Sequence, residues 1–293
     1  MAYSQELRFQ ADRAAQIEVE ATPDYIIDRY RRCRYWRLFP KDYLFKALWR
    51  HGVFSGGKRV LDFGCGEGKV ATELAKLGCR VTGIDISPEL IDLARRRAAL
   101  DGVSDSVELR TADLSGAGMA GESFDVVLCN EVLHHVSIPA VFPRLMAVLK
   151  PDGMAAIAEP IAFSPALQRV RDRVPVEKDA SPDERQLNRE DIAYLRSWFA
   201  ESDAAYFNLF ARVDRLFPNA NKIDQGHVAT KSTLIGIRSL DRALVTACPP
   251  LRKFYGQIVV IGRRLRDHAV NLVVFAAIML PQLADIVDLV SDM

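Results

Sequence analysis

The feature that most restricts the fold of this chain is an apolar run that leads directly into a glycine-rich loop and then into an amphipathic stretch. Val60–Phe63 is followed by Gly64-Cys65-Gly66-Glu67-Gly68, and a helical pattern begins at Lys69. Glycines at such a turn let the chain bend sharply, and they let backbone amides approach a ligand beside the positive end of the next helix. The sequence therefore predicts a strand–loop–helix unit with a ligand at the loop.

Apolar runs and amphipathic stretches continue to alternate after this unit, which is typical of a parallel sheet covered by helices. The expected strands are Arg59–Phe63, Arg80–Asp85, Val107–Thr111, Phe124–Asn130 and Met154–Glu159, and the expected helices between them are Lys69–Leu77, Pro88–Asp101 and Ile138–Leu149. Farther along, the pattern predicts a helix at Glu190–Ala200 with Asn188 as its cap, and strands at Ala205–Val213 and Tyr255–Gly262.

The position of the last glycine in the loop indicates which ligand the loop binds. A dinucleotide-binding loop would need glycine at position 69, where this chain has lysine, and the glycine stands at Gly68 instead. Asp62 stands just before the loop. Both features argue against a nicotinamide cofactor and favour a ligand without a pyrophosphate.

Acidic and polar residues follow the next three expected strands. Asp85 ends the second strand, where a carboxylate can accept hydrogen bonds from both hydroxyls of a ribose. Asp113 follows the third strand and can accept from an amine such as that of adenine, with the backbone of Leu114 beside the ring. Asn130 and Glu131 end the fourth strand and close the crevice. Aspartate and glycine also occur at turns that bind nothing, so each residue has a structural alternative.

Taken together, five segments resemble the successive motifs of class I S-adenosylmethionine-dependent methyltransferases. They are Val60–Gly68, Gly83–Asp85, Ala112–Asp113, Phe124–Val127 and Leu133–Val136, and the turn Lys150–Gly153 is similar to the one that this family has before its fifth strand. The resemblance covers roughly residues 55–160. It implies a Rossmann-like, mostly parallel seven-stranded α/β sheet with helices on both faces, whose last strand, Tyr255–Gly262, is antiparallel.

The resemblance also implies S-adenosylmethionine as the cofactor, with its methionine moiety at the glycine loop, its ribose at Asp85 and its adenine at Asp113 and Leu114. Asp62 is expected to organise the loop and, indirectly, the amino group of the methionine moiety. The expected cofactor-binding residues are Asp62, Gly64, Cys65, Gly66, Gly68, Asp85, Ile86, Asp113, Leu114, Asn130, Glu131 and Tyr30.

Three titratable residues near the rim of the expected crevice are candidate general bases. His134 and His135 stand at the start of the helix expected after the fourth strand, and Glu159 ends the fifth strand. A base is needed only where the acceptor loses a proton, because the sulfonium is already an activated methyl donor. Both histidines have an alternative packing or capping role, and Pro160 favours a structural role for Glu159.

Two other segments have both a functional and a structural interpretation. Basic and aromatic residues interleave between Arg29 and Arg37, and here Tyr30, Tyr35 or Trp36 could cover the cofactor, or the segment could be a solvated helix face with buried aromatic rings. His227 lies in an expected insertion that could shape the acceptor site.

The pattern divides the chain into four parts. We expect an N-terminal helical extension at 1–57, a cofactor-binding core at 58–160, the rest of the fold at 161–262 with an insertion at about 214–253, and an apolar tail at 263–293. The run Ala269–Leu280 is too short to span a bilayer of about 30 Å. It is expected to be a buried helix, a homodimer contact or a peripheral membrane contact.

Composition restricts the partners and the compartment. The chain has 39 basic and 38 acidic residues, so no overall field draws it to nucleic acid. Its five scattered cysteines include no metal-ligand spacing and indicate reduced thiols, and the polar N-terminal segment has no signal-peptide core. These features predict a cytoplasmic protein without a bound metal.

The function expected from these features is methyl transfer to oxygen, nitrogen or carbon of a small molecule, such as a secondary metabolite, a quinone or a sugar. Two alternatives stay open. The acceptor could be lipid-like and delivered from a membrane, or the chain could be a catalytically silent binding module that keeps the fold.

Overall fold

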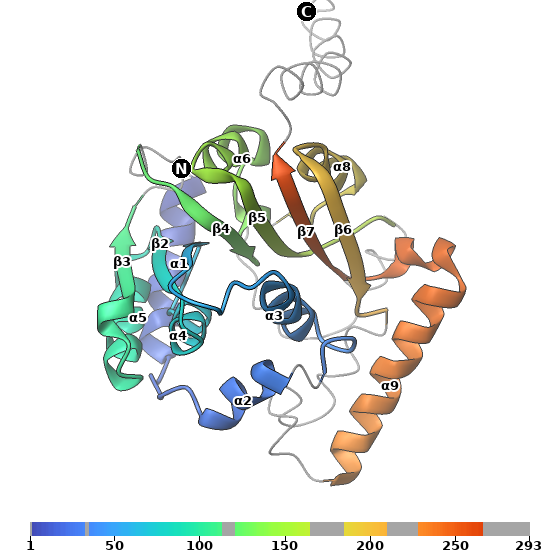
Figure 1. Ribbon diagram of the computed structural model, residues 1–293, viewed down its shortest axis with the longest axis horizontal. Coiled ribbons are helices and arrows are strands. Elements are labelled where there is room, and N and C mark those ends of the chain that lie inside the picture. Colours follow the sequence, from blue (N-terminus) through green and yellow to red (C-terminus); the bar gives the residue numbers. More distant parts are fainter. Residues whose placement is uncertain (1, 33–34, 113–120, 165–184, 210–227, 266–293) are drawn as a thin grey trace, which may run out of the picture.

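A seven-stranded sheet forms the centre of the computed structural model, which describes residues 2–32, 35–112, 121–164, 185–209 and 228–265 (Figure 1). The strand order is β3-β2-β1-β4-β5-β7-β6, and β7 runs antiparallel to both of its neighbours. This confirms the predicted Rossmann-like fold with an antiparallel last strand. The strands are β1 Arg59–Phe63, β2 Arg80–Asp85, β3 Val107–Thr111, β4 Phe124–Asn130, β5 Leu149–Pro160, β6 Phe199–Phe207 and β7 Gln257–Leu265.

Helices connect the strands and extend the fold at its N-terminal side. The α-helices are α1 Ala2–Gln16, α2 Asp24–Arg32, α3 Pro40–Arg50, α4 Lys69–Lys76, α5 Pro88–Leu100, α6 Ile138–Ala147, α8 Arg189–Ser197 and α9 Val228–Ala247, and short 3-10 turns lie at η1 Ser104–Ser106, η2 Leu133–His135 and η5 Pro249–Phe254. The first three form the N-terminal helical extension, and α9 lies in the insertion before β7.

Two hydrophobic layers pack on opposite faces of the sheet because side chains alternate along each strand. Leu61 and Phe63 of β1 pack in one cluster with residues of α6 and α8, such as Phe142. Val60 packs in the other cluster with residues of α3 and α4, such as Phe45. Figure 1 shows α6 and α8 on one side of the sheet and α3 and α4 on the other.

Local sequence signals fix several helix boundaries. The hydroxyl of Ser87 accepts a hydrogen bond from the Leu90 amide at 3.2 Å, just before Pro88 begins α5. The side chain of Asn188 accepts from the Asp191 amide, and the Asp191 carboxylate accepts in return from the Asn188 amide at 2.8 Å. The expected helix start at Pro88 and the expected cap at Asn188 are therefore confirmed, and α8 begins at Arg189, one residue before the predicted start.

The sixth strand lies earlier in the chain than the sequence predicts. It runs over Phe199–Phe207, so the expected strand at Ala205–Val213 is wrong in its bounds and the expected helix ends at Ser197 rather than at position 200. The reason is that β6 is an edge strand with polar residues at positions 201–203, which hides its pattern. Its first residue, Phe199, is buried against Gly262, where a side chain would leave no room for the ring.

Two other expected boundaries differ. His134 and His135 lie in a separate 3-10 turn rather than at the start of a helix. Helix α6 begins at Ile138 as predicted, because Ser137 and Pro139 start it after a break at Val136, but it ends at Ala147 rather than at Leu149. The fifth strand is longer than Met154–Glu159, because Leu149 already pairs with Phe124 across a register shift.

The strand order places a crevice between the carboxyl ends of β1 and β4. The chain adds strands outward from β1 to β3 on one side and from β4 to β5 on the other, so connections leave β1 and β4 in opposite directions. Ligands of open α/β sheets bind at this switch point. The glycine loop follows β1, and Asn130 with Glu131 lies at the end of β4, so both edges of the crevice carry residues that the sequence singled out.

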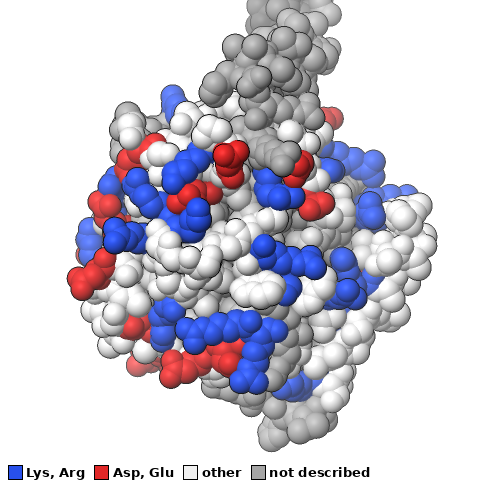
Figure 2. Space-filling model, in the orientation of Figure 1, with Lys and Arg blue, Asp and Glu red and all other residues white. Residues whose placement is uncertain are grey.

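Charge is mixed over the surface. On the face shown in Figure 2, basic and acidic side chains are interspersed, in keeping with 39 basic and 38 acidic residues in the chain. Among the helices that the structure describes, none is both long enough and apolar enough to cross a membrane. Cys65, Cys79, Cys129 and Cys248 are free thiols. Cys33 and the apolar run Ala269–Leu280 lie outside the described residues.

Candidate active site

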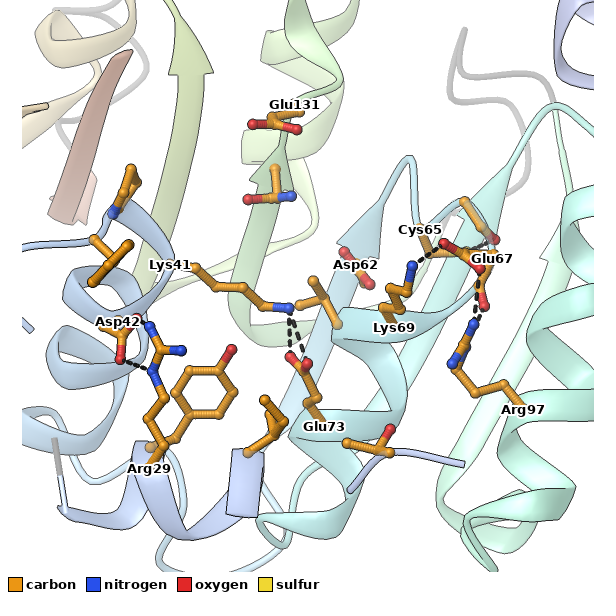
Figure 3. Close-up of a pocket in the computed structure, with 18 of the residues that line it drawn as sticks. Arg29, Lys41, Asp42, Asp62, Cys65, Glu67, Lys69, Glu73, Arg97 and Glu131 are labelled. Carbon is orange, nitrogen blue, oxygen red and sulfur yellow. Dashed lines mark hydrogen bonds and ion pairs between the residues drawn. The ribbon is translucent and has the colours of Figure 1, made fainter. Parts of the chain in front are cut away.

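A cavity of about 1250 Å³ opens at the crevice between β1 and β4 and extends under the N-terminal helices (Figure 3). Its wall is built from the glycine loop, the end of β4, helices α2 and α3, and the insertion before β7. A cavity of this size exceeds most single-ligand sites, which measure about 300–1000 Å³. It therefore has room for two ligands side by side.

The three glycines of the loop have different physical roles, although all have a positive φ. A side chain at Gly64 would lie 2.2 Å from Val132, and one at Gly68 would lie 2.7 Å from Ala94, so both positions are required for packing. Gly66 has a φ of +52° and nothing lies within 4 Å of the place of a Cβ atom. Since Gly66 lines the cavity, this open space is available to a ligand.

Asp85 holds the glycine loop in shape. Its carboxylate accepts one hydrogen bond from the Gly66 amide at 2.8 Å and another from the Ser87 amide at 3.0 Å. Burial raises the pKa of Asp85, and these amide bonds oppose that effect. Asp85 is buried and is not part of the described cavity wall, so it lies directly behind the loop.

Asp62 is a buried carboxylate on the cavity wall. The side chain is 2% exposed, and its Oδ2 atom has no hydrogen-bond partner among the described residues. Burial raises the pKa of Asp62 to about 7, and the nearby carboxylates of Asp85 and Glu73 add to the effect while Lys41 opposes it. An unsatisfied buried carboxylate oxygen is costly, and a cationic ligand group would satisfy it.

Lys41 and Glu73 form an ion pair across the cavity from Glu131 (Figure 3). The ammonium of Lys41, in α3, lies 2.7 Å from one carboxylate oxygen of Glu73, in α4, and 3.0 Å from the other. Burial alone would lower the pKa of Lys41, but the charge of Glu73 outweighs it and the pKa is raised. Lys41 is therefore a fixed positive charge inside the cavity.

Tyr30 packs in the same wall. Its ring stacks on Phe45 with 4.0 Å between the ring centroids, and Lys41 Nζ lies 5.9 Å from the Tyr30 centroid. The ring is buried, and burial raises the pKa of its hydroxyl. Tyr30 is therefore a core residue, as the structural interpretation of this segment expects, and it also lines the cavity, while its contact with a cofactor stays a prediction.

Arginine side chains attach the N-terminal extension to the core. Arg97 of α5 donates to the carbonyl of Glu20 at 2.7 Å and to the carboxylate of Glu67 at 2.8 Å, which joins the segment after α1 to the glycine loop. Arg29 of α2 makes a buried ion pair with Asp42 of α3. The cavity wall on this side is therefore fixed by charge pairs between helices.

His134 and Glu159 form a buried pair beside the crevice. Nδ1 of His134 lies 2.7 Å from Oε2 of Glu159. The other oxygen, Oε1, accepts from the backbone amides of Val132 and Leu133 at 2.9 and 2.8 Å. The ring of His135 lies against that of His134 at a tilt of 40° with centroids 4.1 Å apart, and burial together with His134 lowers the pKa of His135 to about 4. None of the three candidate bases is among the described residues that line the cavity.

Glu131 stands at the end of β4 and lines the cavity. Its φ is +56°, which is unusual for a residue other than glycine. Its Oε1 atom accepts a hydrogen bond from the amide of Gln257 at 3.0 Å. Burial raises the pKa of Glu131, the charge of Glu159 raises it further, and His134, Gln257 and Lys41 oppose the shift.

The structure brings together many of the residues that the sequence singled out. Those that line the cavity are Tyr30, Asp62, Gly64, Cys65, Gly66, Asn130 and Glu131. Gly68, Asp85 and Ile86 lie behind or beside the loop, while Asp113, Leu114 and His227 lie outside the described residues. Their contacts with a cofactor stay predictions.

The sequence pattern did not predict the part of the cavity wall that comes from elements other than the glycine loop and the end of β4. It did not single out Lys41, Glu73 and Arg97, or the later residues Asn208, Arg238 and Gln257. Charged residues on amphipathic helices are ordinary in a sequence, so only their placement distinguishes these. The one local signal was the strand expected at Tyr255–Gly262, which would place Gln257 near an edge of the sheet; the observed strand starts at Gln257 itself and runs to Leu265.

Comparison with known proteins identifies the core. Residues 60–153 match a family described as "Methyltransferase domain". A "Ubiquinone biosynthesis O-methyltransferase" from Xanthomonas axonopodis pv. citri is 40% identical over 116 residues, which are 38% of this chain and 48% of that protein. The chain thus spans about half the length of this curated relative.

Solved structures share the fold at low sequence identity. The [4+2]-cyclase SpnF is similar with a TM-score of 0.50 and 23% identity, covering 72% of this chain and 76% of that one. Phosphoethanolamine N-methyltransferase 2 from Haemonchus contortus is similar with a TM-score of 0.50 and 17% identity, covering 75% of this chain and 53% of that one. With the strand order, the glycine loop and the matched segment in agreement, residues 60–153 are a methyltransferase domain of the class I S-adenosylmethionine-dependent family.

Proposed function

We propose that this protein transfers the methyl group of S-adenosylmethionine to an oxygen atom of a small-molecule acceptor. The observation that carries the proposal is the cavity at the β1–β4 switch point, whose wall combines the open space at Gly66 with the unsatisfied oxygen of Asp62. Both features fit a ligand that places a cationic amino group beside a tight glycine turn.

The residues of the cavity fit the methionine half of the cofactor. Asp62 would hold the ammonium group, since its Oδ2 atom is buried without a partner. Lys41 supplies the opposite charge from the facing wall and would attract the carboxylate of the same moiety. The backbone at Gly66 would pass against the chain of the amino acid.

The adenosine half would lie on the other side of the loop. Asp85 is proposed to accept from the ribose hydroxyls, as the family resemblance implies, and its carboxylate, which already accepts from two backbone amides, lies behind Gly66 at the end of β2. Asp113 and Leu114 follow β3 and are proposed to contact the adenine, as the family resemblance implies. When bound, the cofactor supplies an electrophilic methyl group on a sulfonium, and the protein orients the acceptor and excludes water.

Oxygen is the proposed acceptor atom because the matched relative is named an O-methyltransferase. That relative acts in ubiquinone biosynthesis, so the first acceptors to test are phenols and catechols. The part of the cavity beyond β4 is lined by Asn208, Arg238 and Gln257, which lie outside the matched residues 60–153. We therefore propose that these three side chains, rather than the matched domain, select the acceptor.

The test combines cofactor binding with methyl transfer. Calorimetry with S-adenosylhomocysteine should show one site per chain, weakened in Asp62→Asn. Methyl-labelled S-adenosylmethionine should then transfer its label to at least one member of a panel of phenols and catechols. Binding without transfer to any oxygen, nitrogen or carbon acceptor would instead favour a silent module, and no binding at millimolar concentration would contradict the proposal.

A membrane-delivered acceptor is the second candidate, motivated by the apolar run Ala269–Leu280. Flotation of the full chain with liposomes tests it directly. Flotation with the liposomes that is lost on removing residues 266–293, with transfer to a prenylated phenol enhanced by vesicles, would favour this form of the reaction.

A further inference from the structure

Two residues other than glycine have a positive φ in the described part of the chain, and both lie at the same edge of the cavity. They are Glu131, with a φ of +56°, and Asn208, with a φ of +68°. Such backbone conformations are costly for side-chain-bearing residues, and they concentrate where a site requires them. Both residues line the cavity.

The topology explains why these two residues meet. Glu131 follows β4, and Asn208 follows β6, so both stand at the carboxyl ends of strands that run in the same direction. Because β7 is antiparallel, its first residue, Gln257, starts at that same edge of the sheet. Residues far apart in the sequence therefore converge at one edge.

A directed chain of hydrogen bonds joins them. The amide of Asn208 donates to the side-chain oxygen of Gln257 at 2.9 Å, and the amide of Gln257 donates to Oε1 of Glu131 at 3.0 Å. At the other end, the guanidinium of Arg238 in α9 donates to the side-chain oxygen of Asn208. Every donor points toward Glu131, so the chain runs from a cation to a carboxylate and fixes both amides.

This chain leaves one oxygen of Glu131 for a ligand. Oε1 accepts from Gln257, and Oε2 has no hydrogen-bond partner among the described side chains and amides. The side chain of Glu131 is exposed to the cavity it lines, opposite the Lys41–Glu73 pair (Figure 3). At the switch point, this position lies beside any ligand that the glycine loop holds.

We propose that Glu131 accepts the proton of the acceptor hydroxyl during methyl transfer, and that Gln257, Asn208 and Arg238 position its carboxylate. This inference rests on the proposed function. In the step, the acceptor oxygen forms a bond to the methyl carbon while the carbon–sulfur bond breaks and its electron pair stays on sulfur. The hydroxyl proton moves to Oε2 of Glu131. A positive sulfonium and a negative carboxylate thus become a neutral thioether and a neutral acid.

The surroundings of Glu131 suit a base. The groups that face it are Glu159 on β5, His134 in the turn after β4, Lys41 on α3 and Gln257 on β7, and their net effect with burial is a raised pKa. A carboxylate with a raised pKa is a stronger proton acceptor. By contrast, Glu159 already accepts from two backbone amides and His134, so its oxygens are occupied.

The first experiment compares Glu131→Gln with Glu131→Asp and the matched control Glu108→Gln, an exposed carboxylate on β3 that pairs with Arg110. With the best acceptor of the phenol panel, Glu131→Gln should lower kcat by about 10²–10⁴-fold, the contribution of a positioned base. Glu131→Asp should recover part of the activity, and Glu108→Gln should match the wild type. Affinity for S-adenosylhomocysteine should stay within about two-fold in Glu108→Gln, and in both Glu131 variants it should change by much less than kcat does in Glu131→Gln.

The dependence on pH separates a base from a structural residue. The wild-type rate should rise with pH as Glu131 ionises and then level off. The deficit of Glu131→Gln should shrink as the pH approaches the ionisation of the acceptor itself. Gln257→Met removes a hydrogen bond that lowers the pKa of Glu131, so it should move the rising limb to higher pH and keep the plateau.

A spectroscopic measurement tests the same role without turnover. The absorption band of the chromogenic phenol 4-nitrocatechol, bound to the complex with S-adenosylhomocysteine, reports whether its hydroxyl faces Glu131. The negative carboxylate opposes formation of the catecholate before methyl transfer, so the catecholate band should appear at lower pH in Glu131→Gln than in the wild type. The same titration of the bound phenol in both proteins would overturn the proposal.

The outcomes distinguish the two levels of inference. If the wild type binds cofactor but methylates no hydroxyl in the panel, the proposed function fails and Glu131 loses its role with it. If the wild type methylates a phenol and Glu131→Gln does so within two-fold at every pH, only the assignment of Glu131 is wrong.

Discussion

The imidazole of His134 and the carboxylate of Glu159 lie 2.7 Å apart, and the same carboxylate accepts hydrogen bonds from two consecutive backbone amides after β4. Glu159 is fully buried. The pair therefore connects the end of β5 to the turn that leads away from Glu131. Glu159, one of the three candidate bases, therefore holds the backbone of the turn after β4 in place.

Replacement of Glu159 by alanine should destabilise the protein. It would leave the buried amides of Val132 and Leu133 without an acceptor, and each unsatisfied group costs about 1–3 kcal/mol. The expected decrease in the free energy of unfolding is at least about 2 kcal/mol, measured by urea denaturation. Glu159→Gln keeps an acceptor for both amides and is the matched control. Equal stability of wild type and Glu159→Ala would contradict this reading of the pair.

Alanine replacement of His134 and His135 tests the other two candidate bases. Because neither is part of the described cavity wall, each variant that remains folded is expected to keep kcat within about ten-fold and cofactor affinity unchanged. A decrease of about 10²-fold or more in either variant, with unchanged folding, would identify it as the base in place of Glu131.

Asp62 should make cofactor affinity depend on pH. Its pKa of about 7 means that the cofactor-free protein holds a proton there below neutrality. A ligand ammonium pairs with the ionised form, so affinity for S-adenosylhomocysteine should increase from about pH 6 to pH 8. Calorimetry should show this trend in the wild type and not in Asp62→Asn. An equal trend in both proteins would place the ammonium elsewhere.

The stability of the cofactor-free protein should respond to Asp62 in the opposite direction. Since its pKa is raised on folding, the native state holds more protons than the unfolded state between about pH 4 and pH 7. This contribution to the free energy of unfolding therefore decreases as the pH rises through that window. Asp62→Asn should lack it, and urea denaturation at several pH values measures the difference.

Gly66 offers a test of the loop that avoids backbone strain. Gly66→Asn should fold, because asparagine tolerates a positive φ, but its side chain would enter the space proposed for the methionine moiety. We expect cofactor affinity to fall at least about ten-fold. Gly102→Asn is the matched control, since Gly102 has a φ of +66° and equally open surroundings in the turn after α5. Retained binding in Gly66→Asn would show that the loop serves only as a turn.

Asp85→Ala should weaken cofactor binding by about 1.5–3 kcal/mol, the range for hydrogen bonds to a charged group. The loss has two sources, because the variant lacks an acceptor for the ribose and also releases the Gly66 amide that Asp85 holds at 2.8 Å. Adenosine, which lacks the methionine moiety, separates the two in a binding assay. Unchanged affinity for both ligands would show that the ribose lies elsewhere.

The sequence by itself determined the core of the fold. Val60–Phe63, the glycines after it and the carboxylates at strand ends are local signals, because a strand, a tight turn and a helix each depend on residues near in sequence. The bounds of β6 escaped this reasoning, since the partners of an edge strand are distant: Phe199 pairs with Leu265, and its ring fills the space left by Gly262.

Only the tertiary structure decided which side chains face the cavity. Asn208, Gln257 and Arg238 are unremarkable in the sequence, and they meet Glu131 because an antiparallel β7 begins at the edge where β4 and β6 end. The open space at Gly66 and the unsatisfied oxygen of Asp62 likewise depend on what does not pack against them. Local pattern specifies elements because their hydrogen bonds are short-range in sequence, whereas a cavity wall is made of contacts between elements that no local pattern encodes.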